Sequence, residues 1–235
     1  MTQTPNSRWV DIKVKDGTYG CYLSLPPTGK GPGILLLQEV FGVNRHIRHV
    51  ADQYAAAGFV VMTPDIFWRQ APRVELGYEG ADRDRGIALM KGCNVPELIQ
   101  DLVPAVAALR ALPDCSGKVA TIGYCFGGRL AYLLAAENAV DASVPYYGGG
   151  IQDLLATAPN VKCPMMFQYG ELDKGIPMEA VDKVAKAFAG RKNVTVNVYK
   201  NADHGFNCWD RPMYHKYSSV LALGRTLQFL SETVF

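Results

Sequence analysis

The pattern of hydrophobic and polar positions changes its period after about the first thirty residues. Before that point, residues 9–15 alternate polar and apolar side chains, Asp16 and Gly17 form a turn signal, and residues 18–25 alternate again. Such alternation around a tight turn predicts an antiparallel hairpin over about residues 7–26. Afterwards, short apolar runs alternate with longer segments of helical period. Uninterrupted apolar strands separated by helices predict a mostly parallel sheet with helices on both faces.

The elements expected after the hairpin follow from where these runs begin and end. Strands are expected at residues 34–38, 59–63, 118–124, 142–147, 164–170 and 194–199. Helices are expected at residues 45–57, 126–137, 178–189 and 214–230, with two more between a loop at residues 66–78 and the strand near Cys115. The fold class is therefore α/β, a doubly wound sheet, and in such sheets the functional site lies at the carboxyl ends of the strands.

Length and composition exclude several classes of protein. A chain of 235 residues is long enough for one large domain, which we expect over residues 1–235. A net charge of +2 provides no basic face for nucleic acid. The first residues lack the apolar core of a signal peptide, and no apolar run approaches the about 20 residues of a membrane span. We expect a cytoplasmic protein, a monomer or weak homodimer, without nucleic-acid or membrane partners.

Cysteine usage fits this expectation. The long chain has six cysteines without CxxC spacing, which favours reduced thiols over disulfides. Free cysteines are commonly small buried apolar residues. Cys125 differs because of its neighbours: Gly123-Tyr-Cys-Phe-Gly127 stands between a predicted strand and a predicted helix. A nucleophile at such a turn adopts a strained backbone conformation, needs small neighbours, and has a helix N-terminus behind it.

Three further residues follow predicted strands directly. Glu39 follows residues 34–38, Asp173 follows residues 164–170, and His204 follows residues 194–199. The order nucleophile, acid, histidine is that of the α/β-hydrolases. A free thiol has a pKa of about 8.5, so Cys125 needs a proton acceptor such as His204. Asp173 would hold the imidazole in the required tautomer.

Backbone groups complete the predicted chemistry. The N–H groups of Phe126 and of Val40, in the loop after residues 34–38, are the expected oxyanion donors. Aromatic residues near strand ends are expected to include pocket-lining side chains: Phe41, Trp68, Tyr124, Phe126, Tyr147 and Trp209.

Several rival assignments remain open. Cys125 could be a buried structural thiol, and Glu171 or Asp203 could replace Asp173 as the acid. Asp203 is adjacent to His204, which disfavours contact with its ring. The other histidines fit less well, because His46 and His49 lie in a basic helical stretch where we expect them to be solvated, and His215 lies near the start of the last helix.

Several motifs in order resemble the dienelactone hydrolase family. They are Gln38-Glu-Val-Phe-Gly42, Thr63-Pro-Asp-Ile-Phe67, Gly123-Tyr-Cys-Phe-Gly-Gly128, Tyr169-Gly-Glu-Leu-Asp173 and His204-Gly-Phe206. The resemblance implies a single-domain α/β-hydrolase fold. It also implies opening of an enol lactone to a keto acid, as of dienelactone to maleylacetate, with no cofactor and no metal.

The resemblance also implies roles for charged residues. Glu39 would deprotonate the Cys125 thiol when an anionic substrate arrives. Arg83, or Arg85 in its place, would bind the substrate carboxylate. A second arginine is expected where this chain has Cys208, and Arg211 could replace it. Because of this departure from the family pattern, the identity of the substrate stays open.

Other functions remain as alternatives. A broader carboxylesterase or thioesterase would keep the same three residues with another small-molecule substrate. A thiol redox protein using Cys125 is an alternative of a different class, disfavoured because no resolving thiol is nearby in sequence. A non-catalytic binding protein fits least, because every position of the triad is intact.

Overall fold

Antiparallel pairing opens the chain, as its alternating pattern predicts. In the computed structural model, which describes residues 5–235, β1 (Asn6–Val14) pairs with β2 (Gly17–Leu25), and Val14 lies opposite Gly17. β2 also pairs antiparallel with β4 (Val60–Pro64), which runs parallel to β3 (Gly31–Leu37). Residues Met1–Ala120 form one compact unit, in which the strand order is β1-β2-β4-β3 followed by the first part of β5 (Cys115–Tyr124).

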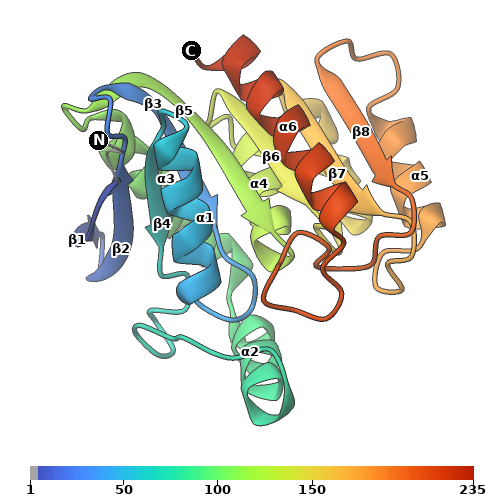
Figure 1. The fold of residues 1–235 in the computed structure, drawn as a ribbon, viewed down its shortest axis with the longest axis horizontal. Helices are drawn as coiled ribbons and strands as arrows, with labels where there is room; N and C mark the ends of the chain where they lie inside the picture. Colours follow the sequence, from blue (N-terminus) through green and yellow to red (C-terminus); the bar gives the residue numbers. More distant parts are fainter. Residues whose placement is uncertain (1–4) are drawn as a thin grey trace. The chain divides into compact units, whose positions relative to one another are not determined.

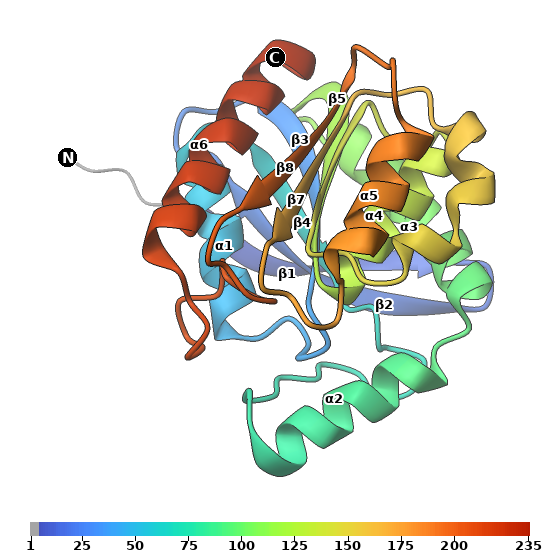
Figure 2. The same ribbon diagram turned by 90° about the vertical axis from the view of Figure 1, so that its right-hand side faces the viewer.

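Two helices of this unit cover its strands on opposite faces (Figure 2). They are α1 (Arg45–Ala56), which packs against β2 and β4, and α3 (Val95–Arg110), which packs against β1, β3 and β4. Each begins at an asparagine whose side chain accepts an N–H of the first turn, the usual way to satisfy helix-terminal donors. By contrast, α2 (Gly80–Gly92) stands off from these strands (Figure 1), and Gly86 is its one buried residue.

The long loop after β4 is held by buried polar contacts. Asp65, in the Thr-Pro-Asp motif, is 2% exposed, and its carboxylate accepts the N–H groups of Phe67 at 3.2 Å and Arg73 at 2.6 Å. Arg69 binds both Asp16 in the hairpin turn, at 2.7 Å, and Asp101 in α3, at 2.8 Å. The motif therefore fixes the loop that leads to α2.

Residues Thr121–Phe235 form the second unit. Its strand order is β5-β6-β7-β8, where β6 (Ala142–Tyr146), β7 (Met165–Gly170) and β8 (Val194–Tyr199) are parallel. α4 (Phe126–Ala136) and α5 (Met178–Ala187) lie on one face of these strands and α6 (Lys216–Thr233) on the other (Figure 2). Two short 3₁₀ helices, Ile151–Asp153 and Leu155–Asn160, were not expected from the sequence.

The predicted fold class is confirmed: a mostly parallel sheet with an antiparallel hairpin and helices on both faces. One expectation about a side chain is wrong. His46, expected to be solvated, is 2% exposed, because it lies on the same face of α1 as Val50 and Tyr54, one and two turns further on. Within residues 5–235, no helix is long and apolar enough to cross a bilayer.

Candidate active site

The turn between β5 and α4 has the strained geometry that its glycines predict. Cys125 is the N-cap of α4 and has φ 56° and ψ −114°, a left-handed φ that non-glycine residues rarely adopt. A Cβ on Gly123 would lie 2.0 Å from the Gly127 carbonyl oxygen, and one on Gly128 would lie 2.6 Å from the Tyr146 carbonyl oxygen. The Cys125 N–H donates to that same Tyr146 oxygen at 3.0 Å. Only glycines permit this close approach, which places the Cys125 thiol at the helix N-terminus.

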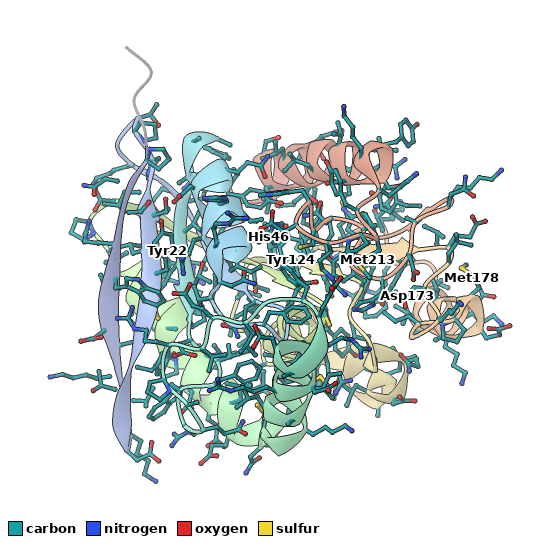
Figure 3. All side chains as sticks on the ribbon, turned by 60° about the horizontal axis from the view of Figure 1, so that its bottom comes forward. Tyr22, His46, Tyr124, Asp173, Met178 and Met213 are labelled. Atoms are coloured by element: carbon teal, nitrogen blue, oxygen red, sulfur yellow. The ribbon has the colours of Figure 1, made fainter. Side chains whose placement is uncertain are left out.

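Asp173, which Figure 3 labels, follows β7, and backbone N–H groups orient its carboxylate. One of its oxygens accepts the N–H groups of Gly175 at 2.8 Å and Ile176 at 3.1 Å. Its other oxygen lies 2.7 Å from Nδ1 of His204, in the loop after β8. The Asp173 side chain is 1% exposed and that of His204 28%. A buried carboxylate therefore fixes the direction of a more accessible imidazole.

The imidazole of His204 is also hydrogen-bonded to the side chain of Cys125. Burial lowers the pKa of His204, but this effect is outweighed by the negative charge of Cys125 and by the hydrogen bonds and charge of Asp173. The pKa of His204 consequently lies well above its ordinary value. Such an environment favours the protonated form of the imidazole.

The rival acids are engaged elsewhere. Glu171 accepts the backbone N–H of Asn201 at 2.9 Å. Asp203 accepts the backbone N–H of His204 at 2.6 Å, so its carboxylate is used on the main chain and not on the ring. His215 caps α6, and its Nδ1 lies 2.6 Å from Oγ of Ser218. Of the three candidate acids, the structure brings Asp173 to the His204 ring.

The position expected to carry a second substrate arginine is buried. Cys208 has no exposed surface, and its side chain carries no fixed charge. Arg211 lies beside the same loop: a Cβ on Gly205, which has φ 78°, would be 2.5 Å from Nη1 of Arg211. The guanidinium thus packs against the backbone next to His204.

The remaining predicted residues belong to Met1–Ala120. Glu39 is 1% exposed and Val40 6%, in the loop after β3. A Cβ on Gly86 of α2 would lie 2.5 Å from the Val40 carbonyl oxygen, so α2 contacts this loop directly. Arg83 and Arg85 are exposed on α2. The roles of these residues toward Cys125 stay predictions.

The cysteines differ in burial, and no disulfide joins any two of them. Cys21, Cys115 and Cys208 are buried, whereas Cys93, Cys125 and Cys163 are half-buried. Burial raises the pKa of the Cys163 thiol to about 11. The described residues contain no group of three or more His, Cys, Asp or Glu side chains suited to hold a metal ion.

A residue that the sequence did not single out lies against His204. Tyr147, directly after β6, has its ring centroid 5.1 Å from that of the imidazole. From the sequence, Tyr147 was only one of six aromatic residues expected near strand ends. A stronger signal was the three consecutive glycines that follow it, because such a run marks a close approach of the backbone to its neighbours.

Comparison with known proteins agrees with this fold. A model of the dienelactone hydrolase family matches residues 20–234. Carboxymethylenebutenolidase 1 of Cupriavidus pinatubonensis (strain JMP 134 / LMG 1197) is 34% identical over 216 residues, which cover 92% of each chain. The carboxymethylenebutenolidase of Pseudomonas sp. (strain P51) is 35% identical over 217 residues, covering 92% of this chain and 91% of that one. The crystal structure of a candidate dienelactone hydrolase from Klebsiella pneumoniae subsp. pneumoniae MGH 78578 superposes with a TM-score of 0.87 at 25% identity, covering 97% of this chain and 99% of that one.

Proposed function

Because this chain belongs to the dienelactone hydrolase family, we propose that it opens an enol lactone of the dienelactone type to a keto acid, without a cofactor. For dienelactone itself the product is maleylacetate. The observation that carries the proposal is the hydrogen-bonded series from Cys125 through His204 to Asp173, at a strand-to-helix turn. The broader class, hydrolysis of carboxylic ester or lactone bonds, is that of the family.

In the proposed first half-reaction, the Cys125 thiolate attacks the lactone carbonyl carbon. The developing oxyanion accepts hydrogen bonds from the N–H groups of Phe126, the first residue of α4, and of Val40. One such donor lowers the barrier by about 3 kcal/mol. The carbon–oxygen bond of the ring then breaks, the leaving enolate takes a proton from His204, and the enol tautomerises to the ketone. The product remains attached to Cys125 as a thioester.

Water completes the proposed second half-reaction. His204, now neutral, accepts a proton from water as the oxygen attacks the thioester carbonyl. The thiolate leaves, and the free acid and the imidazolium–thiolate pair are restored. Asp173 supports both steps, because its charge and hydrogen bond stabilise the cationic imidazole.

Two residues are candidates to take the proton of Cys125. His204 is hydrogen-bonded to Cys125 and has a raised pKa, which favours it in the free enzyme. Glu39 is the acceptor that the family resemblance implies when an anionic substrate binds. The rate at which iodoacetamide alkylates Cys125 distinguishes them: a Glu39→Gln variant that loses only the substrate-induced increase in rate assigns that step to Glu39.

Replacement of the thiol tests the proposal most directly. We expect Cys125→Ala to abolish turnover of cis- and trans-dienelactone and of an activated aryl ester. Cys163→Ala is the matched control, a second half-buried thiol whose pKa burial raises, and we expect it to retain turnover. Full activity of Cys125→Ala would refute the nucleophile. A peroxide-dependent mass increase at Cys125 without any ester turnover would favour the redox alternative.

We further propose that the substrate carboxylate binds Arg83 and Arg211. Gly86 marks the face of α2 that contacts the Val40 loop, and Arg83 lies three residues before it, on about the same face. Arg85, one residue before Gly86, points about 100° away from the direction of Gly86 around the helix axis. Arg83→Ala and Arg211→Ala should therefore impair an anionic lactone far more than a neutral ester, whereas Arg85→Ala should not discriminate. Equal losses on both substrates would reject these roles.

A further inference from the structure

Tyr147 has a backbone conformation that is rare for a bulky side chain. Its φ is 34°, although three glycines follow it and could absorb a left-handed turn. A non-glycine residue at positive φ with a large side chain is an outlier, and such outliers concentrate at functional sites. Its side chain is fully buried. The chain thus keeps an aromatic ring at a position where backbone geometry favours glycine.

The conformation of Tyr147 is held from both sides. Its N–H donates to the carbonyl oxygen of Gln168 in β7 at 2.8 Å. Two residues later, the Gly149 carbonyl oxygen accepts a hydrogen bond from Nε of Arg129, in the first turn of α4, at 2.6 Å. The side chain of the preceding Tyr146 is fixed through its hydroxyl to Thr226 of α6 at 2.6 Å. The backbone at Tyr147 therefore cannot relax without breaking contacts to β7, α4 or α6.

The ring of Tyr147 joins the elements that carry the proposed triad. Its centroid lies 5.1 Å from His204, 5.4 Å from Phe206 in the same loop, and 6.0 Å from Tyr124, which directly precedes Cys125. The interplanar angle to the imidazole is 59°, so the two rings meet in a tilted arrangement. Figure 3 labels Tyr124, which lies at the end of β5.

Asp173 holds only one nitrogen of the imidazole. The bond to Nδ1 sets the direction of that edge of the ring, whereas the tilt of the ring plane depends on the side chains packed against its faces. A flat side chain packed against the imidazole fixes that tilt. Such packing matters most beside a catalytic group, because a small displacement of that group lowers the reaction rate strongly.

From these contacts we infer that Tyr147 is a positioning residue, which holds the His204 imidazole in the orientation that reaches Cys125. The inference rests on the role of His204 in the proposed function. The strained backbone is the means by which the end of β6 turns this ring toward His204. The hydroxyl group is not part of the proposal.

Three substitutions separate the ring from the volume and the backbone. Tyr147→Phe keeps the ring, Tyr147→Leu keeps apolar volume without a flat ring, and Tyr147→Asn removes the ring while tolerating positive φ. We expect Phe to stay within a few-fold of the parent kcat, and Leu and Asn to lower kcat on the order of 10- to 100-fold with little change in KM. Tyr132→Leu is the matched control: it is also a buried tyrosine, whose ring packs on Phe167 and Phe188.

Nuclear magnetic resonance supplies a readout that a merely structural role would not change. The proton on Nδ1 of His204, hydrogen-bonded to Asp173, is expected downfield in the parent and in Tyr147→Phe. In Tyr147→Leu and Tyr147→Asn it should broaden or move upfield as the ring reorients. Tyr132→Leu should lower the melting temperature without changing this signal.

Parent-like kcat and an unchanged His204 signal in Tyr147→Leu or Tyr147→Asn would overturn the inference. So would a kcat loss in Tyr147→Phe equal to that of the other two variants. The proposed function fails separately: if Cys125→Ala retained turnover, the nucleophile would be wrong, while the resonance would still report whether Tyr147 orients His204.

Discussion

At the scale of single residues, the proposed site contains two non-glycine residues with left-handed φ, Cys125 and Tyr147. Each such conformation costs about 1–3 kcal/mol and persists because its surroundings enforce it. Around Cys125 the backbone is closely packed at Gly123 and Gly128, where an added Cβ would collide with backbone oxygens. The sequence predicted this strain, because glycines flank the cysteine between a strand and a helix. It did not predict the contact of Tyr147, because the three glycines after this residue mark a close approach of the backbone but not which ring will meet His204.

The charge of Cys125 makes a residue-scale prediction about His204. Replacing Cys125 with serine removes the negative charge that raises the pKa of His204, whereas burial, which lowers it, remains. We therefore expect the pKa of His204 to fall in Cys125→Ser. Titration of the imidazole carbon-bound protons by nuclear magnetic resonance measures it, and Cys163→Ser serves as the control. An unchanged or higher pKa in Cys125→Ser would contradict an imidazolium–thiolate pair.

At the scale of elements, most of the fold could be predicted because each element carries its own pattern. Alternation gave the hairpin, and apolar runs gave the strands, with ends displaced by one to three residues in most cases. The face of α1 was misjudged at His46, because the polar neighbours Arg45 and His49 concealed its place one turn before Val50. The short 3₁₀ helices were missed since they follow tertiary packing and have no period of their own. The contact between Gly86 of α2 and the Val40 loop was likewise missed, because it joins residues that are far apart in the sequence.

That contact supports a prediction about α2. A methyl group at Gly86 would lie 2.5 Å from the carbonyl oxygen of Val40 and 3.3 Å from its carbonyl carbon, and backbone atoms cannot rotate away. Gly86→Ala should therefore displace the Val40 loop and lower kcat about tenfold, as expected when an oxyanion donor is misplaced. Alanine also favours a helix over glycine by about 1 kcal/mol, so the variant need not be less stable.

Ala88 provides the matched control on the same helix. It is exposed, and Ala88→Gly should cost helix stability of about 1 kcal/mol while preserving kcat. Steady-state kinetics together with melting temperatures separate the two effects. Parent-like kcat in Gly86→Ala, accompanied by a higher melting temperature, would show that α2 does not position Val40.

At the scale of the whole molecule, the boundary between the two compact units is unusual. It falls between Ala120 and Thr121, inside β5, and residues 119–124 of that strand are buried. Boundaries between independent domains normally lie in exposed linkers that few contacts cross. A break between residues 120 and 121 would leave each unit with only part of this strand. The sequence, which has no linker here, predicts a single domain for the same reason.

Cooperative unfolding follows from this shared strand. With about 0.7 kcal/mol per residue near 60 °C, a single transition of the whole chain has a calorimetric enthalpy of about 160 kcal/mol. For one cooperative domain the van't Hoff enthalpy equals this value, whereas for two independent units it falls to about half. We expect one transition in which the ratio of van't Hoff to calorimetric enthalpy is near one. Fragments 1–120 and 121–235, expressed separately, should not melt cooperatively, because the cut between them divides β5. Two resolved transitions, or a separately expressed fragment that melts cooperatively, would show that the units fold as independent domains.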